Sequence, residues 1–212
     1  MSTHAQPMLY TPDPAADEAI GVALAGLAAP GSFFTGAERV DMAAHARVAR
    51  GLADSGPQLD PLMAETVARV AVEAMHSRQE HVAAWEASGR DVLAFVEMVA
   101  VVALISSIDS YRVGLGAPLD PIPGPTPGEP TRADDDRAVT SNAWVPTVGI
   151  ALAPTALNAL PKEKERKDAI SKEWYLTDEF VHKYDVDPGR ELSRAQMELV
   201  ASRTSYLNEC FF

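Results

Sequence analysis

The segment from Val92 to Ile108 constrains the fold more than any other, because Glu97 is its only charged residue. A run of this length without a turn signal favours a buried helix over a strand, and we expect the helix to end at Gly114-Leu-Gly116. The run is shorter than the roughly 18 to 20 apolar residues that cross a bilayer. A lone buried carboxylate is costly, so Glu97 should pair with an arginine such as Arg39 or Arg47, or face a pocket.

Helix signals also flank this run. Thr35 followed by Glu38 has the pattern of a capping box, and Asp60 and Ser193 are placed as N-caps. The mixed charges after Pro161 are typical of a solvated helix face, with Glu163 four residues before a lysine. The sequence therefore predicts an all-α protein with helices over 15–29, from 36 until the turn at 54–57, over 60–87 and 92–114, from 161 to at least 168, and after 193.

A proline-rich stretch divides the chain. Residues 117–130 hold six prolines and two glycines, and three aspartates follow at 134–136. This composition predicts an extended linker without a core of its own. We therefore expect a mobile arm over 1–13, a first helical unit over 14–116, a linker over 117–142 and the start of a second unit over 143–212.

Composition narrows the function classes. The 212 residues are 47% hydrophobic, and 30 acidic against 18 basic residues give a net charge of −12. That charge disfavours binding to nucleic acid or to an anionic membrane surface. The N-terminus has no basic start followed by an apolar core, which predicts a cytoplasmic protein. The only cysteine, Cys210, cannot form a disulfide within the chain.

The last stretch, around this cysteine, has a recognisable pattern. Glu198, Leu199, Ala201, Ser205, Asn208 and Cys210 stand at spacings that resemble the active-site helix of the alkylhydroperoxidase D-like and carboxymuconolactone decarboxylase superfamily. Further segments resemble its long two-unit relatives: Phe34–Arg39, Phe95–Glu97, Gly114–Pro118, Pro127–Pro130 and Ala143–Pro146. The resemblance implies one helical alkylhydroperoxidase D-like unit, without a redox cysteine, followed by the beginning of a second unit that ends at the redox motif.

The resemblance also implies a chemistry. The peroxidase branch of the superfamily uses a Cys-x-x-Cys pair, in which peroxide oxidises one sulfur and the other condenses with it to release water. Cys210 takes the place of the first, resolving cysteine and Glu198 that of the proton-relay glutamate, with Ser205 and Asn208 as supporting residues. The expected partners are a hydroperoxide and a dithiol electron donor. The resemblance further implies a homo-oligomer and no metal or flavin cofactor.

The attacking cysteine of the pair would fall at position 213, just past Phe212, and a histidine four residues further on. Three explanations stay open for the end of the sequence at this point: a fragment, degeneration of the site, or a selenocysteine codon read as a stop. The last makes the natural protein a selenoprotein. Reading the nucleotide sequence past codon 212 tests it, and a codon other than UGA would contradict it.

Other functions and sites remain open at this stage. The chain could be a non-catalytic helical protein that forms oligomers, or a lyase of the carboxymuconolactone decarboxylase type, which requires a basic pocket for its acidic substrate. Glu38, Asp41 and His45 share one helix face and could be a vestigial relay or metal site, although a capping or surface role is the more ordinary interpretation of this spacing.

Overall fold

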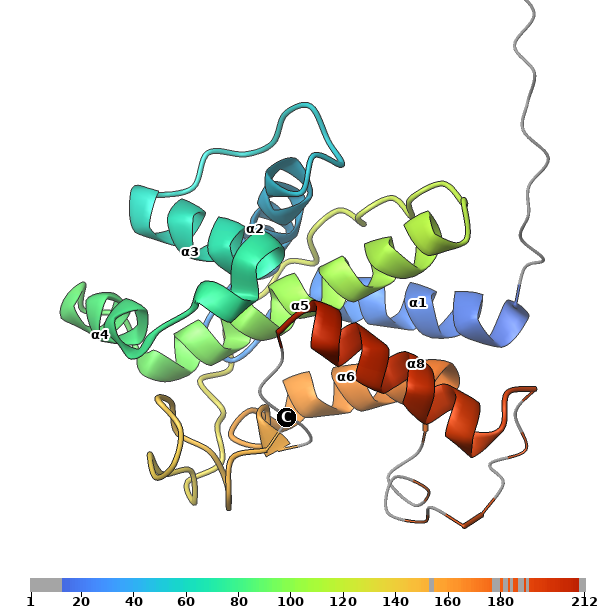
Figure 1. Ribbon diagram of the computed structural model, residues 1–212. Coiled ribbons are helices and arrows are strands. Elements are labelled where there is room, and N and C mark those ends of the chain that lie inside the picture. Colours follow the sequence, from blue (N-terminus) through green and yellow to red (C-terminus); the bar gives the residue numbers. More distant parts are fainter. Residues whose placement is uncertain are drawn as a thin grey trace, which may run out of the picture.

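The computed structural model describes residues 13–152, 155–176, 180, 183, 185–186, 189 and 191–209, and this part of the chain is helical without strands, which confirms the all-α prediction (Figure 1). Its only β-type pairing is an isolated bridge between Val139 and Thr147. The helices are α1 (Pro14–Leu27), α2 (Gly36–Ala49), α3 (Pro61–Glu73), the 3-10 turn η1 (Ala74–His76), α4 (Gln79–Ala87), α5 (Val92–Gly114), α6 (Pro161–Trp174) and α8 (Arg194–Leu207).

Helix α5 is the centre of the core. It contacts α1, α2, α3, α4 and α6, and apolar side chains along most of its length are buried against them. The apolar run thus forms a buried helix that ends at Gly114, as predicted. At 23 residues the helix is long and apolar enough to cross a membrane, contrary to the length argument from the sequence. Two thirds (67%) of its most apolar window is buried within the chain, as in the core helix of a globular protein.

The helix caps follow the local sequence. Thr35 and Glu38 form a capping box, the Asp60 side chain accepts a hydrogen bond from the Met63 amide, and Ser193 caps α8. These three predictions are confirmed. They could be made from local sequence because each cap joins a side chain to a backbone amide only two or three residues away.

Helix α2 ends at Ala49, before the predicted turn at 54–57, and Gly51 follows with a φ of 68°. The single helix expected over 60–87 is also wrong, because the chain breaks at Ser77 and Arg78. No glycine or proline marks this break. Instead, the Arg78 guanidinium donates to the carbonyls of Met75 and Ser77, and the Arg78 amide donates to His81 Nδ1. These local bonds satisfy backbone groups that helix termini leave unpaired.

The break redirects α4 towards the core. Trp85 is fully buried and packs edge-on against Phe95 of α5, with the ring centroids 5.6 Å apart. The Trp85 indole also donates a hydrogen bond to the carbonyl of Asp91, just before α5. The burial of this one large side chain therefore accounts for the change of direction between α3 and α4.

Glu97 pairs with Arg39, as the sequence predicted, and both side chains are fully buried. The second carboxyl oxygen of Glu97 accepts the Phe33 amide at 2.7 Å. Burial raises the pKa of Glu97, and the charge of Arg39 opposes that rise. The buried carboxylate is thus compensated by both a charge and a backbone donor, which is the condition for tolerating it in a core.

The prediction for Glu163 is wrong. Its side chain is 3% exposed and binds Arg39 through both carboxyl oxygens, at 3.0 and 3.1 Å, and it also pairs with Arg166. The charge pattern of α6 resembles that of a solvated helix, but α6 packs against α1 and α5, and Glu163 is thereby buried beside Arg39 of α2. Arg39, Glu97, Glu163 and Arg166 therefore form one buried charge cluster.

Gly31 makes room for this cluster. A Cβ atom on Gly31 would lie 1.8 Å from Glu97 Oε1 and 2.5 Å from Arg39 Nη1, far inside van der Waals contact. The turn between α1 and α2 therefore needs glycine here because of close approach.

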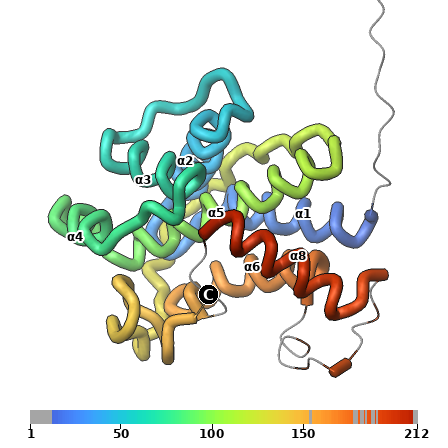
Figure 2. Tube along the Cα trace, viewed as in Figure 1, coloured from blue at the N-terminus to red at the C-terminus, as the bar shows by residue number. Residues whose placement is uncertain are grey.

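The predicted linker is extended, and part of it runs along the segment between α1 and α2. Thr126 donates its amide to the Ala28 carbonyl, and the amides of Thr131 and Arg132 donate to the carbonyls of Gly31 and Ser32. Beyond the linker, α6 lies beside α1, although the two are far apart in sequence (Figure 2). The division into two units stays a prediction, while α6 shares the core of residues 14–116.

Candidate functional site

Helix α8 presents the sequence-predicted residues on one face. Glu198, Ser205 and Asn208 are separated by seven and three residues, so their side chains project from the same side of the helix. Met197, the buried residue of α8, lies next to this face. The side of α8 that carries the predicted site thus faces the rest of the molecule.

Glu198 is held by two donors that both reach the same oxygen. The Tyr175 hydroxyl donates to Glu198 Oε1 at 2.6 Å, and Arg194 Nη2 lies 2.7 Å from that atom. The Glu198 side chain is 41% exposed, whereas that of Arg194 is 10% exposed. The carboxylate is therefore fixed in orientation while it keeps access to solvent.

Tyr175 is placed by α6. It directly follows the last helical residue, Trp174, and its amide donates to the Ser171 carbonyl at 2.8 Å. Trp174 stacks on Tyr111 of α5, with ring centroids 4.9 Å apart and an interplanar angle of 16°. Leu176 on the other side is buried. Tyr175 is thus flanked by two residues that anchor it to the core.

The remaining predicted residues have different surroundings. Ser205 is half-buried two turns after Glu198, and Asn208 caps α8 by donating its backbone amide and its Nδ2 to the Thr204 carbonyl. Glu209 then takes a left-handed backbone conformation, with φ of 52°, so the chain leaves the helix direction there. Cys210 lies outside the described residues.

A groove adjoins Glu198 between the end of α6 and the start of α8. It has a volume of about 610 Å³, and most of its lining is aromatic or aliphatic. Its described lining residues are Asp13, Trp174, Tyr175, Gly189, Glu191, Leu192, Met197, Val200 and Ala201. This arrangement places the Tyr175 ring at the border between an apolar concavity and the carboxylate.

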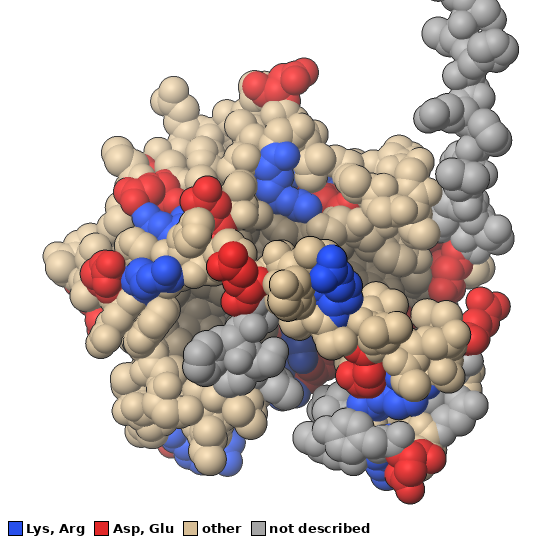
Figure 3. Space-filling view, in the orientation of Figure 1, with Lys and Arg blue, Asp and Glu red and all other residues tan. Residues whose placement is uncertain are grey.

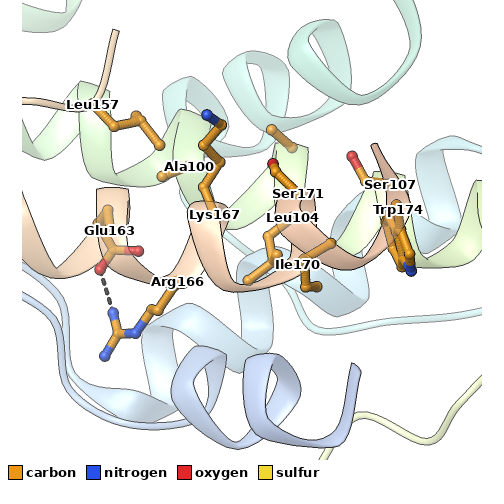
Figure 4. Close-up of a pocket in the computed structure, with 11 residues that line it drawn as sticks. Ala100, Leu104, Ser107, Leu157, Glu163, Arg166, Lys167, Ile170, Ser171 and Trp174 are labelled. Atoms are coloured by element: carbon orange, nitrogen blue, oxygen red, sulfur yellow. Dashed lines mark hydrogen bonds and ion pairs between the residues drawn. The ribbon is translucent and has the colours of Figure 1, made fainter. Parts of the chain in front are cut away.

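A second, smaller concavity of about 120 Å³ lies between α5 and α6 (Figure 4). Arg166 and Lys167 line it, but Arg166 pairs with Glu163, and Lys167 Nζ lies 3.1 Å from an Asp168 oxygen. Burial lowers the pKa of Arg166. Because carboxylates compensate both cations, this concavity is not the basic pocket that the lyase hypothesis requires.

The charges on one face of the molecule are mixed. Figure 3 shows acidic and basic side chains interspersed on it, without a continuous basic patch. This distribution, like the net charge of −12, disfavours binding to a polyanion such as nucleic acid.

Glu38 serves the fold. Its carboxylate accepts the amide and the hydroxyl of Thr35, both at 2.8 Å, which completes the capping box. Asp41 and His45 are half-buried on the same helix. In the part of the chain that the structure describes, no group of three or more His, Cys, Asp or Glu residues could hold a metal ion.

Three contacts were not predicted from the sequence: Arg194 with Glu198, Tyr175 with Glu198, and Arg47 with Asp109. Arg194 lies four residues before Glu198, and this spacing was a readable signal for a helical ion pair. Tyr175 carries no local signal, because 23 residues separate it from Glu198. Asp109 of α5 accepts two bonds from Arg47, at 2.7 and 3.0 Å, and this pair accounts for the second arginine considered for Glu97.

No family model, curated protein or solved structure matches this chain. The all-helical class and the geometry around Glu198 are therefore the basis for a functional proposal.

Proposed function

We propose that this protein is a thiol-dependent hydroperoxide reductase of the alkylhydroperoxidase D-like kind, with Cys210 as its thiol and Glu198 as its proton relay. One observation carries the proposal: Glu198 is fixed through a single oxygen by Tyr175 and Arg194, on the helix face that also bears Ser205 and Asn208. A relay carboxylate needs a defined orientation and contact with exchangeable protons, and Glu198 has both.

The reaction follows from the chemistry of one thiol. The Cys210 thiolate attacks a hydroperoxide oxygen, the O–O bond breaks, and the leaving alkoxide takes a proton to become an alcohol. The sulfur is thereby oxidised to a sulfenic acid. One thiol of an external dithiol attacks this sulfur and releases water, and the second thiol of the donor then closes the donor disulfide and frees Cys210. Glu198 accepts and returns the protons.

Turnover by this chain should be slow. The superfamily resemblance gives Cys210 the resolving position. Its sulfur must here attack the peroxide, a step that the resemblance assigns to the other cysteine of the pair. The groove beside Glu198 offers an apolar surface next to the relay carboxylate, which suits a substrate with a hydrocarbon part.

Peroxide consumption with dithiothreitol as electron donor tests the proposal. Cys210→Ser should abolish the protein-dependent rate, and Glu198→Gln should lower it about 100-fold, the lower range for loss of a general acid or base. Dimedone should label Cys210 in the wild type after peroxide treatment, as detected by mass spectrometry. Equal rates for wild type and Cys210→Ser would remove the redox function from this chain.

A second candidate function, self-association, is favoured by the opposite face of α8. Leu199, Tyr206 and Leu207 are each more than 60% exposed there. Three large apolar side chains on one short helix form a patch of the kind that proteins use for contact with partners. Changing Leu199 and Leu207 to glutamate should reduce the particle size measured by light scattering, and an unchanged size would exclude this surface.

A further inference from the structure

The contact between Tyr175 and Glu198 joins two helices that touch little elsewhere. Tyr175 follows α6, which the core holds through Ile170 and Trp174, whereas most of α8 is exposed and Met197 is its only buried residue. The 2.6 Å bond from the Tyr175 hydroxyl is therefore a direct link between the core and the helix that carries Glu198.

We infer that Tyr175 is a positioning residue for the relay carboxylate, a role that goes beyond the proposed function and rests on it. Its hydroxyl sets the rotation of the Glu198 carboxylate and the distance of α8 from the end of α6. Tyr175 acts through Glu198 and need not touch the peroxide itself.

The bonding of Glu198 supports this role. Tyr175 and Arg194 both bind Oε1, and no described residue makes a hydrogen bond to Oε2. Two donors at one oxygen restrict rotation about the last side-chain bond, which leaves the second oxygen with a defined direction. A proton carried on Oε2 would therefore be delivered along a fixed path. Loss of one donor would let the carboxylate rotate and would widen the range of directions in which Oε2 points.

The two donors are not equivalent. Arg194 belongs to α8 itself, four residues before Glu198, so it moves with the helix. Tyr175 belongs to the core side, where Trp174 stacks on Tyr111. Tyr175 thus ties Glu198 to the end of α6 on the core side, whereas Arg194 ties it to α8 and, through Nη1, to the Phe180 carbonyl at 2.8 Å.

Kinetics of the full chain test the inference. With hydrogen peroxide and dithiothreitol, Tyr175→Phe should lower kcat about tenfold and leave KM within about a factor of two, because the hydroxyl orients a proton carrier and binds no substrate. In a Glu198→Gln background the same substitution should change kcat by less than about twofold, since both changes affect one relay. A purely structural role would instead give equal effects in both backgrounds.

Ser202→Ala is the matched control, because it also removes one hydroxyl, which is exposed on α8 and donates to the Leu199 carbonyl of the same helix at 3.1 Å. It should behave as wild type. A second measurement does not depend on turnover: the rate of Cys210 alkylation by iodoacetamide should fall about threefold in both Tyr175→Phe and Glu198→Gln.

The outcomes separate the two claims. If Cys210→Ser abolishes peroxide consumption while Tyr175→Phe retains the wild-type kcat, the reductase stands and the role of Tyr175 is overturned. If Cys210→Ser consumes peroxide as fast as wild type, the reductase fails. The alkylation rates then decide whether Tyr175 acts on the surroundings of the thiol, and identical rates in all variants overturn the inference.

Discussion

Charged and apolar side chains are buried to opposite degrees in the core around α5 and on the exposed helix α8. In the core, Arg39, Glu97 and Glu163 are buried and bind one another. On α8, Glu198 keeps contact with solvent, and large apolar side chains such as Leu199 project outward. Buried charges with several partners make the first region specific and sensitive to substitution, whereas the second region has little burial to lose.

The largest effect should come from breaking the buried charge cluster. Arg39→Ala leaves Glu97 and Glu163 without their shared cation, and should lower the free energy of unfolding by about 3 to 5 kcal/mol, measured by urea denaturation. Arg69→Ala is the matched control, because Arg69 pairs with the exposed Glu65 and should cost no more than about 1 kcal/mol. Similar losses for the two variants would contradict the contrast.

Equal truncations of leucine should separate the two regions next. Leu27 is fully buried, so Leu27→Ala should cost about 3 kcal/mol from lost burial and the cavity left behind. Leu199 is 69% exposed, and Leu199→Ala should stay within about 0.5 kcal/mol. Thermal unfolding of both variants measures the difference, and a large loss for Leu199→Ala would show that the outer face of α8 is covered in solution.

The space for the cluster can be tested at Gly31. Gly31→Ala forces Glu97 and Arg39 away from their positions and should lower the free energy of unfolding by about 2 kcal/mol. Gly21→Ala is the control, because nothing lies within 4 Å of its Cβ position and it sits inside α1, where alanine should add about 0.5 to 1 kcal/mol. Urea denaturation should thus show a lower free energy of unfolding for Gly31→Ala and a higher one for Gly21→Ala, although the two substitutions are chemically identical.

The smallest effect concerns pH. Burial raises the pKa of Glu97 above its ordinary value of 4.5, so the folded state binds this proton more tightly than the unfolded state. Stability from this group is therefore lost as the pH rises above 4.5 towards the folded pKa. Glu97→Gln cannot ionise, so its free energy of unfolding relative to wild type should rise with pH in that window, by at most about 1.4 kcal/mol per pH unit. Denaturation at a series of pH values checks the sign, and a falling difference would contradict it.

Local features of the fold were predictable from the sequence, and long-range ones were not. The caps at Thr35, Asp60 and Ser193 depend on residues two or three positions away, so their patterns were sufficient. The break at Ser77 has no glycine or proline, and it depends on the burial of Trp85. Its position could not be predicted because the cause lies in tertiary packing.

The candidate site likewise has residues that the sequence predicted and a contact that only the structure shows. The sequence pattern singled out Glu198, Ser205 and Asn208, and a helix necessarily places them on one face. The donor from Tyr175 depends on how the end of α6 meets α8, which no spacing reveals. Cys210 stays a prediction.

The sequence by itself determined the all-α class, the buried helix from Val92 and the need of Glu97 for a cation, because hydrophobic periodicity and the cost of a buried charge act on any chain with this pattern. Only the tertiary structure decided that Glu163 joins Glu97 on Arg39, and that Tyr175 binds Glu198. Both contacts join residues far apart in the chain, and their partners follow from the packing of α6 against the core.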